Sequence, residues 1–150
     1  MNLNGRSTLV TGGAGGLGEA VVRLFAAAGA SVVIFDAAAD RARRLADELG
    51  DTVLAVAGDV LSETSVGEAV EVATGLGELS AVAIVHGAGV AGRTVNRDGT
   101  PHDLDLFQRT INLNIVGTFN VVRLAAVVMA GNEPDEHGQR GVFINTASIA

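Results

Sequence analysis

The end of the chain carries a hydroxyl at a position where binding sites are often built. The stretch "GVFINTASIA" is an apolar run followed by Asn145, Thr146 and Ser148. A buried strand that delivers a hydroxyl to its carboxyl end commonly serves a site lying beyond that end of a sheet. The simpler alternative is a strand-end hydroxyl that only caps a turn. Ser148 is therefore a candidate site residue whose partners must come from elsewhere in the chain.

A second group of residues has the composition of a phosphate-binding turn. The stretch "TGGAGGLG" covers residues 11–18. Glycines there allow positive φ angles, a close approach to a pyrophosphate and tight packing of the next helix, whose N-terminus favours anions. A merely flexible turn is the alternative, but a strand before it and a helix after it favour dinucleotide binding. The predicted cofactor-binding residues here are Gly12, Gly15, Gly16, Leu17 and Gly18.

An acidic residue, Asp36, ends the next apolar run. A carboxylate at that point of a dinucleotide-binding unit accepts hydrogen bonds from the adenosine ribose hydroxyls and repels a 2′-phosphate. No arginine follows it, because positions 37–39 are all alanine. The sequence therefore predicts NAD, rather than NADP, as the cofactor.

These residues need a scaffold that brings several strand ends together. Short β-branched runs alternate with longer stretches of helical periodicity. The predicted strands are 7–12, 31–36, 52–60, 81–89 and 141–148, and the predicted helices are 17–30, 39–50, 63–77 and about 103–130. Continuous apolar strands separated by helices indicate a parallel sheet covered on both faces. The predicted fold class is α/β, a Rossmann-type doubly wound parallel sheet forming one domain over residues 1–150.

Two of these helices have a predicted packing. In the helix 17–30, Val21, Leu24 and Phe25 are expected on the buried face. In the second half of the helix 103–130, apolar residues occur nearly all round. One face must then lie on the sheet, and the other must be buried elsewhere.

The composition argues against several kinds of site and partner. The absence of cysteine removes disulfides and thiolate sites, and a net charge of −7 argues against binding nucleic acid. His102 and His137 lack metal-ligand spacing, so no metal is expected. The most apolar stretch, "FNVVRLAAVVMA", has 12 residues and is too short to cross a bilayer. We therefore expect a cytoplasmic protein with no membrane partner.

The glycine spacing TGxxxGxG, which begins at Thr11, resembles that of the short-chain dehydrogenase/reductase family. Later stretches resemble motifs of the same family in the same order: "GDV" (58–60), "HGAG" (86–89), "NIVG" (114–117) and "INTAS" (144–148). A narrower resemblance, to the type-2 3-hydroxyacyl-CoA dehydrogenase branch, rests on "FQRTINLNIVGTFNVVRLAA" and "GNEPDEHGQRGVFINTAS". The resemblance implies further cofactor contacts, namely Asp59 and Val60 at the adenine and Gly87, Ala88 and Gly89 along the cofactor.

The resemblance also implies a catalytic mechanism. Ser148 would hold the substrate oxygen, and Asn114 would hold a water for proton relay. A tyrosine, with its pKa lowered by a lysine, would act as the acid and base. The chain contains no tyrosine and no lysine. We therefore expect residues 1–150 to be the N-terminal part of a longer enzyme, with five strands of about seven, and to be inactive alone. The resemblance implies that the longer protein forms a homotetramer through the long helix.

Several functions remain open at this point. The favoured one is an NAD-dependent dehydrogenase of secondary alcohols with 3-hydroxyacyl-CoA as substrate. The alternatives are a hydroxysteroid dehydrogenase, a 3-oxoacyl thioester reductase and a non-catalytic NAD-binding module. Asp36 argues against the reductase, because the resembling reductases usually take NADPH. His86 replaces an asparagine usual in the family, and is either a pH-sensitive contact near the cofactor or a hydrogen-bonded strand-end residue.

Overall fold

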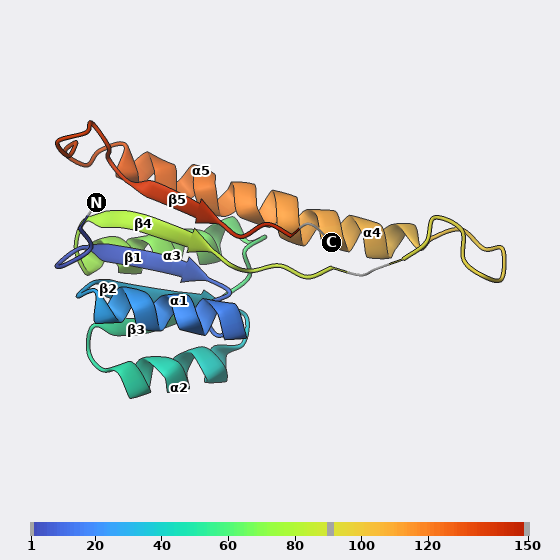
Figure 1. The fold of residues 1–150 in the computed structure, drawn as a ribbon, viewed down its shortest axis with the longest axis horizontal. Helices are drawn as coiled ribbons and strands as arrows, with labels where there is room; N and C mark the ends of the chain where they lie inside the picture. Colours follow the sequence, from blue (N-terminus) through green and yellow to red (C-terminus); the bar gives the residue numbers. More distant parts are fainter. Residues whose placement is uncertain (1, 90–91, 149–150) are drawn as a thin grey trace.

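The fold alternates strands and helices along the chain, as the sequence predicts (Figure 1). The computed structural model describes residues 2–89 and 92–148. Its strands are β1 (Ser7–Thr11), β2 (Ser31–Asp36), β3 (Val53–Ala57), β4 (Leu79–Ile84) and β5 (Val142–Asn145). Its helices are α1 (Gly16–Ala27), α2 (Ala39–Leu49), α3 (Glu63–Gly75), α4 (Leu104–Ile111) and α5 (Thr118–Met129), with a π-helical segment, η1 (Asn112–Gly117), between the last two.

The described strands form one parallel sheet in the order β3-β2-β1-β4-β5. Helices α1 and α2 pack together on one face, and α3 and α5 pack together on the other. The predicted α/β class and doubly wound sheet are confirmed. Chain order reverses beside β1, which pairs with β2 on one side and β4 on the other. Such a reversal leaves a crevice at the carboxyl ends of the two diverging strands.

The core has two halves because successive strand residues point to opposite faces. Leu9 of β1 packs toward α3 and α5 with Val33 and Val82, its partners in the neighbouring strands. Val10, the next residue, packs toward α1 and α2 with Ile34. These strands are apolar on both faces since neither face meets solvent.

The buried face of α1 differs from the one predicted. Val22 and Phe25 are buried as expected for a core helix, but Leu24 is 65% exposed. The buried stripe runs through Gly18, Val22 and Phe25, spaced at i, i+4 and i+7. Gly18 lies against the glycine turn and thereby sets the rotation of the whole helix. The prediction that Leu24 is buried was wrong for this reason.

Helices α4 and α5 join through η1 into one helix, Leu104–Met129, of 26 residues. By length and composition alone this helix could cross a membrane, whereas the apolar stretch considered in the sequence has only 12 residues. The inward side of α5 packs on β4 and α3, with Val121, Ala125 and Met129 buried. Core packing on this side therefore accounts for part of the apolar character of the 26-residue helix. Phe119 and Val127 on the other side are exposed, so the helix has apolar residues on both faces, and the burial of the second face elsewhere stays a prediction.

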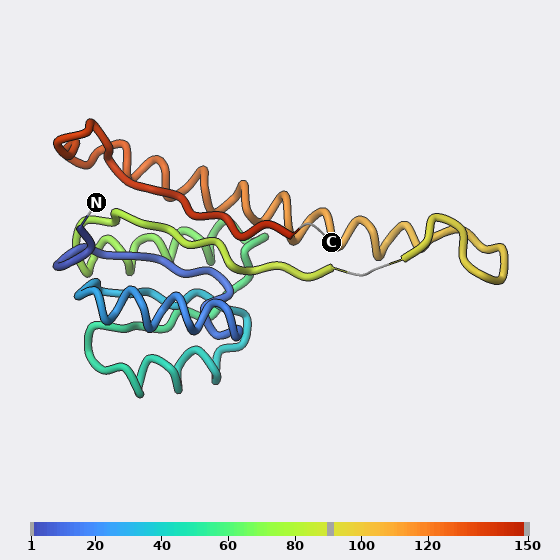
Figure 2. Tube along the Cα trace, viewed as in Figure 1, coloured from blue at the N-terminus to red at the C-terminus, as the bar shows by residue number. Residues whose placement is uncertain are grey.

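An arm, made of residues 92–103 and α4, projects from the body of the molecule (Figures 1 and 2). Its loop is ordered by local hydrogen bonds: the backbone nitrogen of Asn96 donates to the carbonyl of Thr100, and Val95 forms an antiparallel bridge with Pro101. The side chain of Asp103 caps α4 by accepting from two backbone nitrogens of the first turn. The polar loop was predicted, whereas its hairpin-like order was not.

Strand ends differ from the predicted ones at the edge where the site residues lie. Strand β5 ends at Asn145, so Ser148 lies beyond the strand and not on it. The backbone nitrogen of Thr146 still donates to the carbonyl of Ile84 at 3.0 Å. Strand β4 likewise ends at Ile84, which leaves "HGAG" in the loop that follows. The predicted strands were too long because apolar and small residues continue past the last ladder hydrogen bonds.

Candidate functional site

The glycine turn between β1 and α1 has no room for side chains at two positions. Gly12 has φ +67°, and a Cβ there would lie 2.7 Å from the backbone of His86. A Cβ on Gly18 would lie 2.0 Å from the carbonyl oxygen of Gly12. Both glycines are therefore required by close backbone approach. The turn is closed by a hydrogen bond of 3.0 Å from the Gly15 nitrogen to the Gly12 oxygen.

The N-terminus of α1 is open to an anion. Gly15 occupies the N-cap position without any side-chain cap, and Gly16 and Leu17 in the first turn are exposed. The first N–H groups of a helix lack intrahelical partners and carry the positive end of the helix dipole. No Cβ position at Gly16 comes within 4 Å of another atom, so a ligand can approach the backbone there. The residues present fit a pyrophosphate group.

Asp36 ties the end of β2 to this turn. Its Oδ2 accepts from the backbone nitrogen of Ala14 at 2.9 Å, and its Oδ1 accepts from that of Ala38 at 2.8 Å. These bonds fix the plane of the carboxylate. A carboxylate has about four lone-pair sites, so capacity remains for hydroxyl donors of a ligand.

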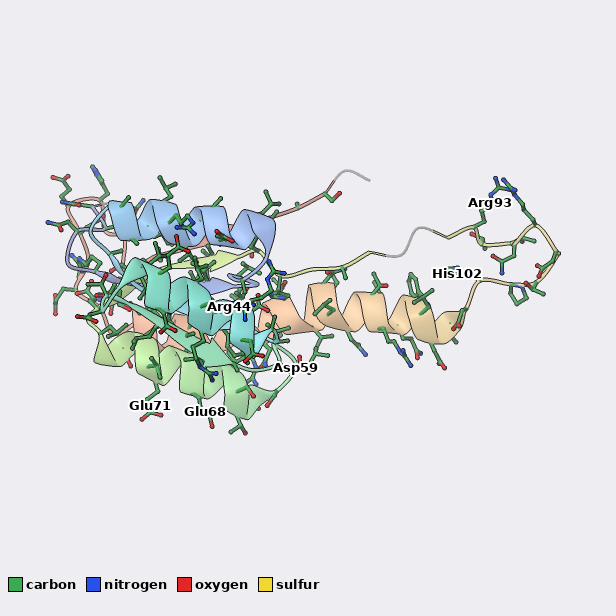
Figure 3. All side chains as sticks on the ribbon, turned by 90° about the horizontal axis from the view of Figure 1, so that it is seen from below. Arg44, Asp59, Glu68, Glu71, Arg93 and His102 are labelled. Carbon is green, nitrogen blue, oxygen red and sulfur yellow. The ribbon has the colours of Figure 1, made fainter. Side chains whose placement is uncertain are left out.

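The "GDV" turn after β3 is held in place by a hydrogen bond from the buried side-chain amide of Asn120. Asp59 is exposed, and its carboxylate accepts from the backbone nitrogen of Leu61 at 2.9 Å. Val60 is buried, and its carbonyl accepts from Nδ2 of Asn120 at 2.8 Å. Asn120 in turn accepts from Arg123. In Figure 3, Asp59 lies at the end of the body from which the arm projects, whereas Arg93 and His102 lie out on the arm.

Asn114 is hydrogen-bonded in both directions to the loop after β4. Its Oδ1 accepts from the Ala88 nitrogen at 3.1 Å, and its Nδ2 donates to the Ala88 oxygen at 2.7 Å. A Cβ on Gly87 would lie 2.9 Å from the Asn114 Oδ1, so glycine is needed for this approach. Asn114 lies in η1, and single π-helical turns inside α-helices occur frequently at functional sites. The side chain of Asn114 therefore fixes the backbone of the loop after β4, although the two are far apart in the sequence.

These segments surround one cleft of about 290 Å³ at the carboxyl ends of β1, β2, β3 and β4. The predicted residues that line it are Gly12, Gly15, Asp36, Asp59, Val60 and Gly87. Lining residues that sequence reasoning missed are Phe35, Ala37, Gly58, Val85 and Leu113. Most of these residues are next to a predicted residue in the sequence, so the positions that flank each motif could have been used to find them. His86, for which a contact near the cofactor was one of two predicted roles, also lines the cleft. The predicted residues outside the lining are Gly16, Leu17, Gly18, Ala88, Gly89, Asn114 and Ser148.

Ser148 is exposed and lies beyond the end of β5. Asn145 is opposite Ile84 in the parallel ladder, so the segment that leads to Ser148 leaves the sheet at the edge where "HGAG" also begins. The structure therefore brings Ser148 to the predicted edge of the sheet, but not into the cleft.

A larger cavity, of about 430 Å³, lies at the opposite end of the sheet. Charged residues from the segments before β1, β4 and β5 line it, and Arg6 and Glu78 among them form an ion pair. The backbone nitrogens of His137 and Gln139 donate to Asp135, which lowers the pKa of that carboxyl. Within residues 2–89 and 92–148, no three histidine or acidic side chains form a group able to hold a metal ion.

The comparisons with known proteins agree with the motifs and the fold. Residues 6–150 match the family model described as short chain dehydrogenase. The chain belongs to the short-chain dehydrogenase family. The sequence predicted the glycine turn, the acidic end of β2 and the strand-end loops as motifs of this family.

Its similar relatives within the short-chain dehydrogenases include 3-hydroxyacyl-CoA dehydrogenases type-2. The chain is 46% identical to that of Drosophila melanogaster, covering 95% of this chain and 57% of the relative. It is 41% identical to that of Homo sapiens, covering 99% of this chain and 58% of the relative. The chain thus spans a little over half the length of these relatives. The narrower resemblance seen in the sequence is confirmed.

Two solved structures of the family are also similar. A crystal structure of 3-hydroxyacyl-CoA dehydrogenase type-2 from Mycobacterium avium has a TM-score of 0.93 and 51% identity, covering 97% of this chain and 57% of the other. A structure of 3-ketoacyl-(acyl-carrier-protein) reductase from Brucella melitensis, complexed with NADH, has a TM-score of 0.80 and 33% identity, covering 97% and 58%. The sheet and its helices are therefore shared by a dehydrogenase and a reductase.

Proposed function

We propose that residues 1–150 form the NAD-binding part of a dehydrogenase that acts on secondary alcohols, with 3-hydroxyacyl-CoA as the favoured substrate. The observation that carries this proposal is the carboxylate of Asp36. Backbone hydrogen bonds from Ala14 and Ala38 hold it beside the glycine turn, in the lining of the cleft. A fixed negative charge there accepts hydrogen bonds from ribose hydroxyls and disfavours a 2′-phosphate.

The other proposed cofactor contacts are the residues predicted from the sequence. The open first turn of α1, at Gly15, Gly16 and Leu17, would hold the pyrophosphate. Asp59 and Val60 would lie along the adenine. The Gly87–Gly89 loop would lie along the rest of the cofactor, and its position is set by Asn114. When bound, NAD supplies hydride transfer chemistry, while the protein supplies orientation and electrostatics.

Ser148 and Asn114 are the proposed catalytic residues of this chain. Ser148 would donate a hydrogen bond to the substrate oxygen, where a positioned donor stabilises developing charge. Asn114 would hold a water molecule near the backbone of η1, and this water would relay protons. A tyrosine and a lysine would supply the acid–base chemistry, and both would come from residues outside the present sequence, which contains neither.

The substrate class is supported by the relatives named 3-hydroxyacyl-CoA dehydrogenase type-2. Hydroxysteroids are an alternative substrate, and a 3-oxoacyl thioester reductase is an alternative activity. A reductase of similar fold has been solved with NADH, so a preference for NAD does not separate the two activities. Asp36 therefore argues less strongly against a reductase.

We also propose a cytoplasmic homotetramer. The exposed side of the Leu104–Met129 helix carries large apolar side chains, and contiguous patches of this kind mark interaction surfaces. They are Leu104, Phe107, Ile111, Ile115, Val116, Phe119 and Val127. The proposed occupant of this surface is the same helix of a second copy.

The experiment is a turnover assay on the full-length protein that contains residues 1–150. NADH absorbance is followed with a 3-hydroxyacyl-CoA, a hydroxysteroid and, in reverse, a 3-oxoacyl thioester, each with NAD(H) and NADP(H). We expect the highest kcat/KM with 3-hydroxyacyl-CoA and NAD. NADH binding without turnover of any substrate would instead support the non-catalytic module. Sedimentation of the same sample tests the tetramer.

A further inference from the structure

His86 lies between the glycine turn and the π-helical segment. The backbone of His86 is so close to Gly12 that a Cβ on that glycine would lie 2.7 Å from it. On the other side, a Cβ on Gly117 of η1 would lie 3.3 Å from the His86 Nε2. Two glycines from distant segments thus make space for one histidine. The ring occupies the place where β1, β4 and η1 meet.

The two ring nitrogens of His86 have different surroundings. Nδ1 lies 2.7 Å from the hydroxyl oxygen of Thr11, the last residue of β1. Nε2 is buried and has no hydrogen-bond partner among the described residues. Burial lowers the pKa of His86, and the backbone of Leu113 in η1 acts in the opposite direction.

In the neutral ring, one nitrogen carries a hydrogen and the other accepts. The proposed form has the hydrogen on Nε2, so that Nδ1 accepts from the Thr11 hydroxyl. The only other ionisable groups lining the cleft are Asp36 and Asp59, and the glycine turn and η1 contribute none.

We propose that His86 is a positioning residue that joins the glycine turn to η1, through its hydrogen bond with Thr11 and its close packing against Gly117, and thereby strengthens cofactor binding. Thr11 directly precedes Gly12, and η1 carries Asn114, which holds the Gly87–Gly89 loop. His86 therefore connects two backbone segments that both contribute to the lining of the cleft. This inference rests on the proposed NAD-binding function for its affinity readout.

Two substitutions separate this role from simple space filling. His86→Phe keeps a ring between Gly12 and Gly117 but removes both nitrogens. His86→Asn loses volume, but its amide oxygen can take the place of Nδ1 and accept from Thr11. In the full-length protein, NADH fluorescence titration should show about tenfold weaker binding for His86→Phe and near-normal binding for His86→Asn, as expected for one lost hydrogen bond. Thr11→Val should match His86→Phe, and the double variant should be no weaker than either single one.

His137→Phe, at the opposite end of the sheet, is the matched control and should bind NADH normally. Normal binding by His86→Phe with weakened binding by His86→Asn would overturn the proposal in favour of space filling. Additive effects of Thr11→Val and His86→Phe would also overturn it. If His86→Phe fails to fold, Thr11→Val, which removes only the hydroxyl, tests the same hydrogen bond.

A measurement without cofactor keeps the two proposals separate. The ¹⁵N chemical shifts of the His86 ring should show a protonated Nε2 and a hydrogen-bonded, unprotonated Nδ1. Thr11→Val should shift the Nδ1 signal alone. The opposite tautomer would overturn the role of His86 even if NADH binds. A wild-type protein that shows the expected tautomer but does not bind NADH would instead refute the proposed function.

Discussion

The Oδ2 of Asp36 accepts a hydrogen bond from the backbone nitrogen of Ala14 at 2.9 Å, joining the acidic end of β2 to the middle of the glycine turn. The other carboxylate oxygen accepts from Ala38 at 2.8 Å. The residue proposed to choose the cofactor is thus held by the turn proposed to bind its phosphates. Cofactor selection and phosphate binding therefore depend on the same backbone hydrogen bonds.

Replacing Asp36 by alanine should change the choice of cofactor. NAD should bind at least about tenfold more weakly, since a charged hydrogen-bond acceptor is lost, and NADP should bind better, since repulsion of its phosphate is removed. Titration of the full-length protein with both nucleotides measures the ratio. Asp40→Ala, on the exposed start of α2, is the control. An unchanged ratio would refute the assignment of Asp36.

Two glycines of the same turn should respond differently to alanine. Gly18→Ala places a Cβ 2.0 Å from the Gly12 oxygen, so it should destabilise the fold by more than about 2 kcal/mol. Gly16→Ala meets nothing within 4 Å and should leave the free energy of unfolding nearly unchanged. It should still weaken NADH binding, because the methyl group lies where the phosphates approach. Thermal unfolding and NADH titration of both variants check this, and equal unfolding temperatures would contradict it.

Asn120 should matter for stability although it lies outside the cleft. Asn120→Ala leaves the buried carbonyl of Val60 without its donor and removes the acceptor of Arg123. The expected loss is about 1–3 kcal/mol of the free energy of unfolding, measured by urea denaturation. Asn112→Ala, at an exposed position of η1, is the control. Asn120→Ala with wild-type stability would show that the "GDV" turn holds its shape unaided.

His86 should make the protein less stable in mild acid. Burial lowers the pKa of His86 below its usual value of about 6.5, so the unfolded chain takes up a proton at a higher pH than the folded one. The contribution is fully present above about pH 6.5 and is lost as the pH falls from there toward the lower folded-state pKa. Urea denaturation between about pH 5 and 7.5 should show this slope. His86→Asn should reduce it, and His137→Asn should not.

Ser148 should affect turnover and not cofactor binding. In the full-length protein, Ser148→Ala should lower kcat by at least about 10²-fold, as when a donor to the reacting oxygen is removed. Because Ser148 does not line the cleft, the affinity for NAD should stay nearly constant. Thr64→Ala, an exposed hydroxyl loss on α3, is the control. Normal turnover by Ser148→Ala would leave the serine with a structural role only.

The parts of the fold that follow from local pattern were predictable. The second strand was predicted at 31–36, as found, because a continuous apolar run ends there at a charged residue. The glycine turn and Asp36 were predictable because each stands at the end of a strand. The two strands, β1 and β2, are adjacent and parallel, so their ends lie close together. Each of these features depends on few residues outside its own segment.

The features that depend on contacts between distant segments were missed. Leu24 was predicted to be buried because helical periodicity gives a stripe but not its rotation, which the close contact of Gly18 with Gly12 sets. The π-helical turn was also missed, since it depends on the approach of Asn114 to Ala88 and of Gly117 to Val60. The bond between Thr11 and His86 joins the end of β1 to the loop after β4, which is far away in the sequence. No pattern within either segment indicates it.

The central position of β1 also suggests an order of events in folding. Pairing β1 with β2 closes a loop that contains only α1, whereas pairing β1 with β4 closes one that contains everything from α1 to α3. Loop-closure entropy grows with length, so the unit from β1 to β3 should assemble first and serve as the template on which β4 docks. During refolding, amide hydrogens of Val10 and Val32 should then gain protection from exchange before that of Val82.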